Sequence, residues 1–181
     1  GSDNTALLRK FARVVRRHYP AAGRSGMVAP PGRPRIRVGF LSRHFHAHSV
    51  ARTTHGLIHD LPRERFEVIA YAIEPRTDPW AHAIRESAES YVALPADPAH
   101  IRATLEGAGL DVLIFADIGM DPLTYYLAFW RFAPFQMTTW GHPVTSGIDT
   151  IDYYLSATSL ETEGADLHYT ERLVRLPGYF M

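Results

Sequence analysis

Residues 134–153 read PFQMTTWGHPVTSGIDTIDY, and the pattern within them decides the fold class. Residues 134–140 and 151–155 have the length and composition of strands, and 134–140 fits a strand that is covered on both faces. The loop between them is rich in small and hydroxyl-bearing residues, and it carries His142, Thr145, Ser146 and Gly147. Open α/β folds place their ligands in loops that follow parallel strands. The stretch therefore predicts a parallel sheet with a ligand site after this strand.

Predicted strands alternate with predicted helices over most of the chain. The predicted strands are 35–41, 66–73, 90–94, 111–116, 134–140, 151–155 and 173–176. Segments with helical periodicity lie at 4–19, 50–60, 78–88, 98–108 and 121–131. Strands alternating with helices at this spacing form βαβ units. The predicted fold class is α/β, a doubly wound Rossmann-like parallel sheet preceded by one helix.

Three of the predicted helices begin with the same dipeptide. Asp-Pro occurs at 78–79, 97–98 and 121–122. Aspartate is a favoured N-cap residue, and proline is favoured at the first helical position. We therefore interpret Asp121 as a helix cap, although it lies near candidate site residues.

The ends of the chain suggest how it is divided. Gly1–Ser2 resembles an expression remnant. Residues 3–34 comprise the leading helix and a Pro/Gly-rich linker, and 35–181 form the predicted lobe. Residues 179–181 are large and apolar and would normally be buried, so we expect a truncation before a second lobe and self-association of the fragment.

Bulk composition excludes several classes of protein. Apolar residues make up 46% of the 181 residues, which excludes a disordered chain, and the absence of cysteine excludes disulfides and thiolate metal sites. The formal net charge is zero, so nucleic-acid binding is not expected. The arginines near the N-terminus favour a solvated surface over an RNA or membrane arm. The sequence shows neither a membrane-length apolar run nor a secretory signal, so we expect a cytoplasmic domain without membrane contact.

The segment LSRHFHAHSVARTTHGLIHD at 41–60 holds five of the ten histidines. His44, His46 and His48 alternate directly after the first strand, so two of them could face a crevice together. His55 and His59 have the spacing of a helical metal chelate, and a metal-dependent hydrolase remains an alternative. A hydrolase barrel would need far more chain. We therefore predict no metal site.

His48 is the preferred chemical group of this segment. A neutral imidazole can accept a hydroxyl proton or donate to a phosphate oxygen. Ser49 follows it and a helix begins there, and helix N-termini stabilise anions. Asp117, just past the fourth strand, could accept a hydrogen bond from a sugar hydroxyl, hold His48 in one tautomer, or only shape a turn.

The loop at 141–147 is the third candidate. His142 precedes Pro143 and is therefore held extended. Thr145, Ser146 and Gly147 can present hydroxyl and N–H groups to phosphate or sugar oxygens. The nucleotide-binding patterns GxxxxGK[ST] and GxGxxG are absent, as is the serine-hydrolase pattern GxSxG.

Taken together, these segments resemble glycosyltransferase family 41, which includes the O-GlcNAc transferases and the bacterial cytoplasmic N-glucosyltransferases. The matching segments are RVGFLSRHFHAHS at 37–49, LDVLIFADIGMD at 110–121, RFAPFQMTTWGHPVTSGIDTIDYYLS at 131–156 and HYTERLVRLPG at 168–178. The resemblance covers about 35–181. It implies the N-terminal lobe of a GT-B glycosyltransferase, a fold of two facing Rossmann-like lobes.

The resemblance also implies an activity. Such enzymes transfer a sugar from a UDP-sugar donor to a protein acceptor, with inversion and without a metal or other cofactor. The missing C-terminal lobe would bind most of the donor, so we expect this fragment alone to be inactive. Tetratricopeptide-like helices often precede the lobe, and the helix at 4–19 could be the last of them.

The family pattern also assigns site residues. It makes His48 the catalytic histidine, and it places His142, Thr145, Ser146 and Gly147 near the substrate. We add His44 and Asp117 to the binding set. Family members of the O-GlcNAc branch usually carry an acidic residue where His44 stands and a proline where Ser49 stands. The HFHxHS and IGMD segments look more like the N-glucosyltransferase branch, and the TSG and LVRLPG segments more like the O-GlcNAc branch. Transfer of GlcNAc to Ser/Thr is the leading prediction; transfer of glucose to Asn and a non-catalytic peptide- or sugar-binding module are the alternatives.

Overall fold

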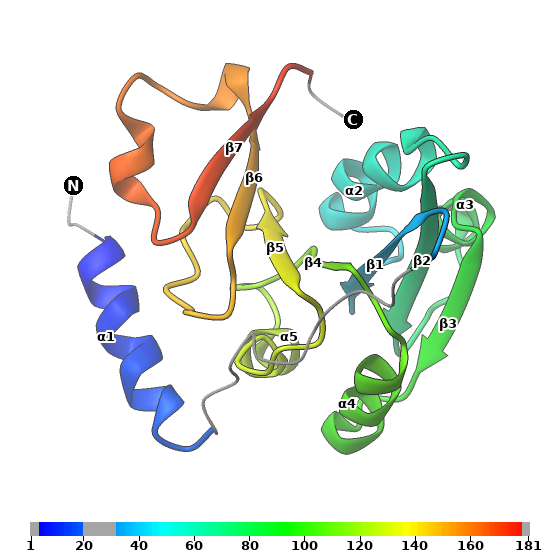
Figure 1. Cartoon of the computed structure of the whole chain (residues 1–181), viewed down its shortest axis with the longest axis horizontal. Helices are drawn as coiled ribbons and strands as arrows, with labels where there is room; N and C mark the ends of the chain where they lie inside the picture. The colour runs from blue at the N-terminus through cyan, green and yellow to red at the C-terminus, as the bar shows by residue number, and fades with distance from the viewer. Residues whose placement is uncertain (1–3, 20–31, 179–181) are drawn as a thin grey trace.

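The computed structural model describes residues 4–19 and 32–178, and this part of the chain contains one sheet of seven strands in the order β3-β2-β1-β4-β5-β6-β7 (Figure 1). The strands are β1 Ile36–Ser42, β2 Phe66–Ile73, β3 Ser90–Leu94, β4 Val112–Phe115, β5 Phe135–Thr139, β6 Tyr153–Ala157 and β7 Arg172–Leu176. The helices are α1 Asn4–Arg16, α2 Ser49–Asp60, α3 Pro79–Ser87, α4 Pro98–Gly107 and α5 Pro122–Leu127, with short 3-10 turns η1 Thr158–Leu160 and η2 Ala165–His168.

Every strand pairing in the sheet is parallel. The chain runs outward from β1 to β3, returns to the other side of β1, and continues outward from β4 to β7. The reversal between β1 and β4 is the position where open α/β sheets bind ligands. The predicted doubly wound parallel sheet is confirmed.

Two hydrophobic cores cover the two faces of the sheet. One contains Ala12 and Val15 of α1, together with buried side chains of α4 and α5. The other contains Val50 and Ile58 of α2 and Ile84 of α3. Strand side chains alternate between the faces, so a strand covered on both sides is apolar almost throughout. This explains the buried runs of β2 and β4.

The three predicted Asp-Pro helix starts are confirmed. In each case the aspartate carboxylate accepts from a backbone N–H of the first turn and proline occupies that turn. The distances are 2.9 Å from Trp80 N to Asp78, 3.0 Å from Ala99 N to Asp97 and 3.0 Å from Thr124 N to Asp121. Each cap of this kind stabilises a helix by about 1 kcal/mol.

Helix α5 is shorter than the predicted 121–131, because it ends at Leu127. Beyond that point the N–H groups of Phe129 and Trp130 bond to carbonyls three residues back, at 3.1 and 3.0 Å. This spacing tightens the chain into a 3-10 turn and ends the α-helix. The apolar periodicity continues through this turn, and for that reason the sequence predicted a helix longer than the one observed.

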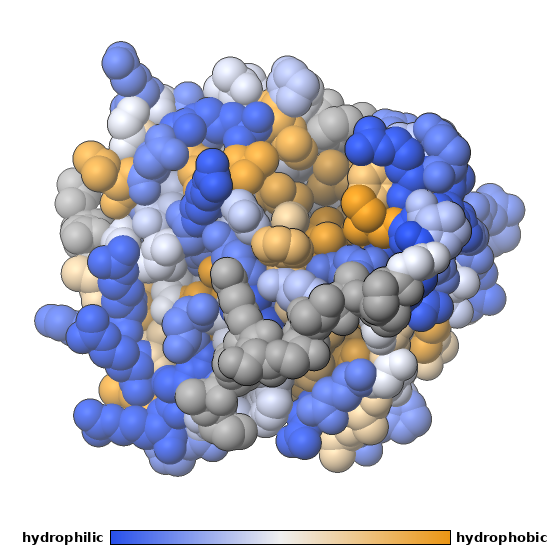
Figure 2. All heavy atoms as spheres, viewed as in Figure 1, coloured by the Kyte–Doolittle hydropathy of each residue, from blue (hydrophilic) through white to orange (hydrophobic). Residues whose placement is uncertain are grey.

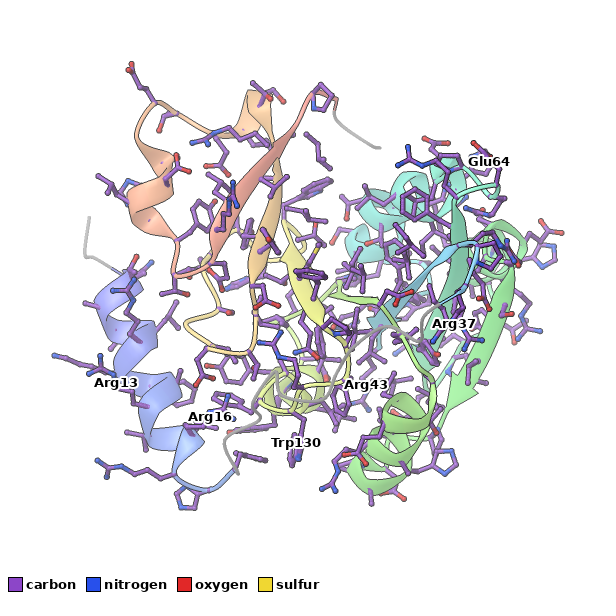
Figure 3. The ribbon with its side chains drawn as sticks, in the orientation of Figure 1. Arg13, Arg16, Arg37, Arg43, Glu64 and Trp130 are labelled. Atoms are coloured by element: carbon purple, nitrogen blue, oxygen red, sulfur yellow. The ribbon has the colours of Figure 1, made fainter. Side chains whose placement is uncertain are left out.

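Helix α1 lies beside β6 and β7 in Figure 1 and is fastened to the lobe by polar contacts. Thr5 Oγ1 donates to the carbonyl of His168 at 3.0 Å, and Arg16 Nη1 donates to that of Phe129 at 2.7 Å. Arg16, which reaches from α1 into the lobe in Figure 3, also pairs with Asp149. The leading helix is therefore packed onto the sheet domain.

Figure 2 shows apolar atoms gathered in the area between β7 and α2. Half-buried side chains of β5 and β7 belong to the core on this face, including Met137, Val174 and Leu176. Among the described residues, no helix is long and apolar enough to cross a membrane. The expression remnant, the linker between 20 and 31, and the apolar end at 179–181 lie outside the described residues, so the predictions about them stay predictions.

Candidate active site at the carboxyl edge of the sheet

The adjacent strands β1, β4 and β5 end at the same edge of the sheet, because they are parallel neighbours. The segments that follow these three strands carry the predicted site residues. His44 and His48 follow β1, Asp117 follows β4, and 142–147 follow β5. The structure therefore brings all three candidate segments to one edge, at the reversal point of the strand order.

Asp117 is completely buried and joins the ends of β1 and β4. Its Oδ2 accepts from Ser42 Oγ and from the N–H of Arg43, both at 2.8 Å. Burial raises the pKa of this carboxyl to about 6, against the lowering effect of these donors. Its Oδ1 is buried and has no hydrogen-bond partner in the described part of the chain. Asp117 is thus a buried structural residue that ties the end of β4 to the end of β1.

His48 is the N-cap of α2, and its Nδ1 accepts from the N–H of Val50 at 3.2 Å. The proton of the neutral ring must then be on Nε2, which makes Nε2 a donor. Of the three roles considered for Asp117, that of setting this tautomer is not borne out, because Asp117 Oδ2 bonds to Ser42 and Arg43 and helix α2 itself sets the tautomer. Burial, followed by the charge of His44, lowers the pKa of His48, so the ring is neutral near pH 7. Nε2–H can donate to a ligand oxygen.

The rings of His44 and His48 stack with centroids 4.3 Å apart and planes 19° apart. His46 meets both rings edge-on, at 5.7 and 5.8 Å. Burial lowers the pKa of all three imidazoles, which allows them to lie together without mutual repulsion. His44 is therefore placed to support the ring of His48, and its own Nδ1 is buried without a hydrogen-bond partner in the described structure.

His55 and His59 are the pair whose spacing suggested a metal site as an alternative. His55 bonds to Ser87 Oγ at 3.0 Å, and His59 bonds to Asp60 at 2.7 Å. Among residues 4–19 and 32–178, no three His, Cys, Asp or Glu side chains are grouped so that they could hold a metal ion. The hydrolase alternative therefore gains no ligand set from the described residues.

Arg43 is a residue at this edge of the sheet whose ion pairs the sequence interpretation missed. It lies toward the middle of the view in Figure 3, and its guanidinium is 3.3 Å from Asp121 Oδ2 and also pairs with Glu74. Asp121 thus caps α5, as predicted, and also anchors the segment after β1. The position of Arg43, one residue beyond β1, was the available signal.

A cavity of about 480 Å³ opens between α1, α5 and the loop after β5, and we call it the α1–α5 cavity. Its walls are mostly apolar and aromatic, with Asp121 and His142 as polar groups. The ring of His142 lies against Gly119, where a Cβ atom would come within 2.4 Å of it. Gly119 has a φ of 91°, so only glycine fits both the turn and the contact.

The lining of the α1–α5 cavity is Asn4, Leu7, Leu8, Phe11, Ile118, Gly119, Met120, Asp121, Pro122, Tyr125, Tyr126, His142, Val144, Thr145 and Ser146.

Thr145 and Ser146 border this cavity, but their hydroxyls do not face it as we predicted. Both residues are buried, and both hydroxyls donate to the carboxylate of Glu171. Gly147 has a φ of 73° and lies against the backbone of Leu8, where a Cβ atom would come within 2.6 Å. The physical reason is that a buried hydroxyl must form a hydrogen bond, and the Glu171 carboxylate is the strongest acceptor within reach. A role of these three residues in substrate binding stays a prediction.

Comparison with known proteins gives a consistent result. The model of the family described as "Glycosyl transferase family 41" matches residues 14–181. A UDP-glucose:protein N-beta-glucosyltransferase of Actinobacillus pleuropneumoniae serotype 5b (strain L20) is 32% identical over 143 residues, which are 76% of this chain and 22% of that protein. Its counterpart from serotype 7 (strain AP76) is 34% identical over 77 residues, 42% of this chain and 12% of that protein.

A solved structure of a mutant of the Thermobaculum terrenum O-GlcNAc transferase is also similar. It superposes with a TM-score of 0.79 at 26% identity, over 97% of this chain and 34% of that one. The chain thus spans about a fifth of the serotype 5b relative and a third of the solved structure. With a family match that covers nearly its whole length, the chain belongs to glycosyl transferase family 41.

Proposed function

We propose that the full-length protein transfers a sugar from a UDP-sugar to a protein, and that this chain supplies the acceptor-side lobe. Family membership and the printed activities of the relatives support the reaction class. The observation that carries the proposal is His48, whose neutral ring holds Nε2–H available beside the first turn of α2. A second lobe, following this one, would bind the rest of the donor.

The proposed chemistry needs little from this lobe beyond hydrogen bonding and charge. When the acceptor hydroxyl or amide attacks the anomeric carbon, the sugar–phosphate bond breaks, UDP leaves with the electron pair, and the acceptor's proton passes to the leaving phosphate. His48 Nε2–H donates to an oxygen of the reacting groups, and the N-terminus of α2 favours the negative charge on the leaving phosphate. We propose inversion at the anomeric carbon and no metal, with His44 stacked on His48 to hold its ring.

The proposed acceptor path is the α1–α5 cavity. It lies on the side of the site where His142 stands, and its walls combine the leading helix with the loop after β5. Pockets of this kind, mostly apolar with few polar groups, bind ligands by shape and orient them by the polar groups. Asn4, Asp121 and His142 are the polar residues on this lining that we propose for orientation.

Two versions of the reaction remain to be separated. The solved O-GlcNAc transferase structure favours GlcNAc transfer to Ser/Thr, which is the leading proposal. The two N-glucosyltransferases favour glucose transfer to Asn as the second candidate. The described contacts of this lobe are compatible with either acceptor. The contacts that would select the sugar belong to the second lobe, which we propose binds most of the donor.

The test is a transfer assay with the full-length protein. It is incubated separately with UDP-GlcNAc and with UDP-glucose, with proteins and peptides that contain Ser/Thr or Asn. Intact-mass measurement detects the added sugar, and peptide fragmentation identifies the residue that carries it. A parallel reaction with a chelator tests the metal-independent step. Unchanged mass with every donor and acceptor would overturn the proposal.

A further inference from the structure

Glu171 is a buried acidic residue that lies just before β7, in the segment 168–178 and outside the three segments that hold the candidate site residues. Only 6% of it is exposed. A buried carboxylate is costly unless hydrogen bonds satisfy its oxygens. Its partners therefore show what the fold gains by keeping it there.

Those partners all come from two short segments. Oε1 accepts from the N–H of Ser146 at 2.8 Å and from the hydroxyl of the same residue. Oε2 accepts from Thr145 Oγ1 at 2.6 Å and from the N–H of Thr170 at 3.1 Å. Oε1 thus bonds only to the loop after β5, whereas Oε2 bonds both to that loop and to the residue before Glu171.

Further bonds fix the rest of this loop. Ser146 Oγ accepts from the N–H of Ile148 at 3.1 Å, and Thr145 Oγ1 accepts from the N–H of Thr170 at 2.9 Å. Gly147 N–H donates to Thr170 Oγ1 at 3.2 Å. Each loop hydroxyl therefore donates to Glu171 and accepts from the main chain, so its conformation is determined on both sides.

The loop held in this way is also a wall of the α1–α5 cavity. Thr145 and Ser146 line the cavity, while Gly147 presses against the backbone of Leu8 in α1. The carbonyl of Ser146 is further contacted by Tyr125 OH at 3.5 Å, from the opposite wall. A change at Glu171 would release the loop from α1 and alter the shape of the cavity, without touching the histidines after β1.

We propose that Glu171 is a positioning residue for the protein acceptor. Its carboxylate holds 145–147 against α1 and so sets the wall of the α1–α5 cavity that the acceptor enters. The inference rests on the proposed function for the identity of the entering molecule. It concerns acceptor affinity; donor binding and the chemical step lie elsewhere.

The test uses Glu171→Gln in the full-length protein. The amide keeps the size of the side chain but replaces one acceptor oxygen by a donor, which faces the donors of the loop. We expect the KM for the acceptor to rise about tenfold, the effect of losing one charged hydrogen bond. The kcat and the KM for the UDP-sugar should stay within about twofold, because the histidine segment is untouched.

Hydrogen exchange gives a second readout that does not depend on activity. In Glu171→Gln the amides of Ser146, Gly147 and Ile148 should exchange at least about tenfold faster, while those of β1 and β4 keep their rates. Ser146→Ala, which leaves the carboxylate intact, should change the same amides. It also serves if Glu171→Gln does not yield folded protein. Glu163→Gln, at an exposed site of the same region, is the matched control and should change nothing.

The outcomes separate the two proposals. Unchanged exchange and unchanged acceptor KM in the variants would overturn the role of Glu171. Loss of kcat together with faster exchange throughout the sheet would also overturn it, because that pattern indicates a purely structural residue. A wild-type protein that transfers no sugar would count against the proposed function alone, and the exchange experiment would still decide whether Glu171 holds the loop.

Discussion

The segment after β1 and the loop after β5 both gather polar side chains at the same edge of the sheet, yet they use them in opposite ways. After β1, His48 keeps Nε2–H available beyond its cap bond. After β5, the hydroxyls of Thr145 and Ser146 are consumed within the protein by Glu171. The segment after β1 can therefore supply a hydrogen-bond donor to a reaction, whereas the loop after β5 supplies the shape of the cavity wall. The hydroxyl-rich sequence of the loop after β5 alone did not show that these hydroxyls bond within the protein.

The largest expected effect is on His48, in the segment assigned to chemistry. His48→Ala in the full-length protein should lower kcat by about 100-fold or more, because a positioned donor at the reacting groups is lost. Steady-state kinetics with saturating donor and acceptor measures it. His82→Ala, at an exposed site on α3, is the control. Unchanged turnover in His48→Ala would remove the chemical role of His48 and favour a lobe that only binds peptide or sugar.

The next effect is on Gly147, in the segment assigned to shape. Gly147→Ala should lower the free energy of unfolding by about 3 to 4 kcal/mol, because it combines a positive φ with overlap of the Leu8 backbone. Denaturant unfolding measures the loss. The kcat of the protein that remains folded should be nearly unchanged.

Gly164 provides the matched control for Gly147. Its φ is 79°, but a Cβ atom there would meet nothing within 4 Å. Gly164→Ala should therefore cost only the backbone strain, about 1 kcal/mol. Equal losses in the two variants would contradict the close contact between the loop and α1.

The third effect concerns Asp117, whose carboxylate joins the end of β4 to the end of β1, where the histidine segment begins. Its pKa is raised to about 6 by burial, from an ordinary value of 3.8. Between these values the unfolded chain releases the proton while the folded protein keeps it. The contribution of Asp117 to the free energy of unfolding therefore falls as the pH rises from about 4 to about 6. Above pH 6 the total loss is about 3 kcal/mol.

Asp117→Asn tests this directly, since the amide does not ionise and can still accept from Ser42 Oγ and Arg43 N. The gap in unfolding free energy between variant and wild type should move in favour of the variant as the pH rises from 4 to 7. Carboxyls with lowered pKa, namely Asp78, Glu89 and Asp166, are present in both proteins and cancel in the comparison. A constant gap over this pH range would show that Asp117 is ionised in the fold as readily as in the unfolded chain.

Much of the fold could be predicted because its signals are local. The Asp-Pro helix starts at 78, 97 and 121 depend on neighbours within three residues, and strand alternation depends on the next two. The end of α5 was missed, since the 3-10 turn after Leu127 keeps the same apolar rhythm.

The site was less predictable, because its decisive contacts span long distances in the sequence. Which atoms the hydroxyls of Thr145 and Ser146 would contact depended on Glu171, about 25 residues further along the chain. Similarly, the tautomer of His48 followed from its own helix and did not require Asp117. Sequence patterns identify the strand ends, but the partner of each polar atom there is a property of the packed fold.

The cap on α2 has one further consequence. Because the Val50 N–H occupies Nδ1 of His48, the acid–base identity of this imidazole is tied to the integrity of a single helical turn. If the first turn of α2 frayed, Nδ1 would be freed, the proton could redistribute between the two nitrogens, and Nε2 would no longer be a dedicated donor. The opening turn of α2 is in this sense part of the hydrogen-bond donor that we propose at His48.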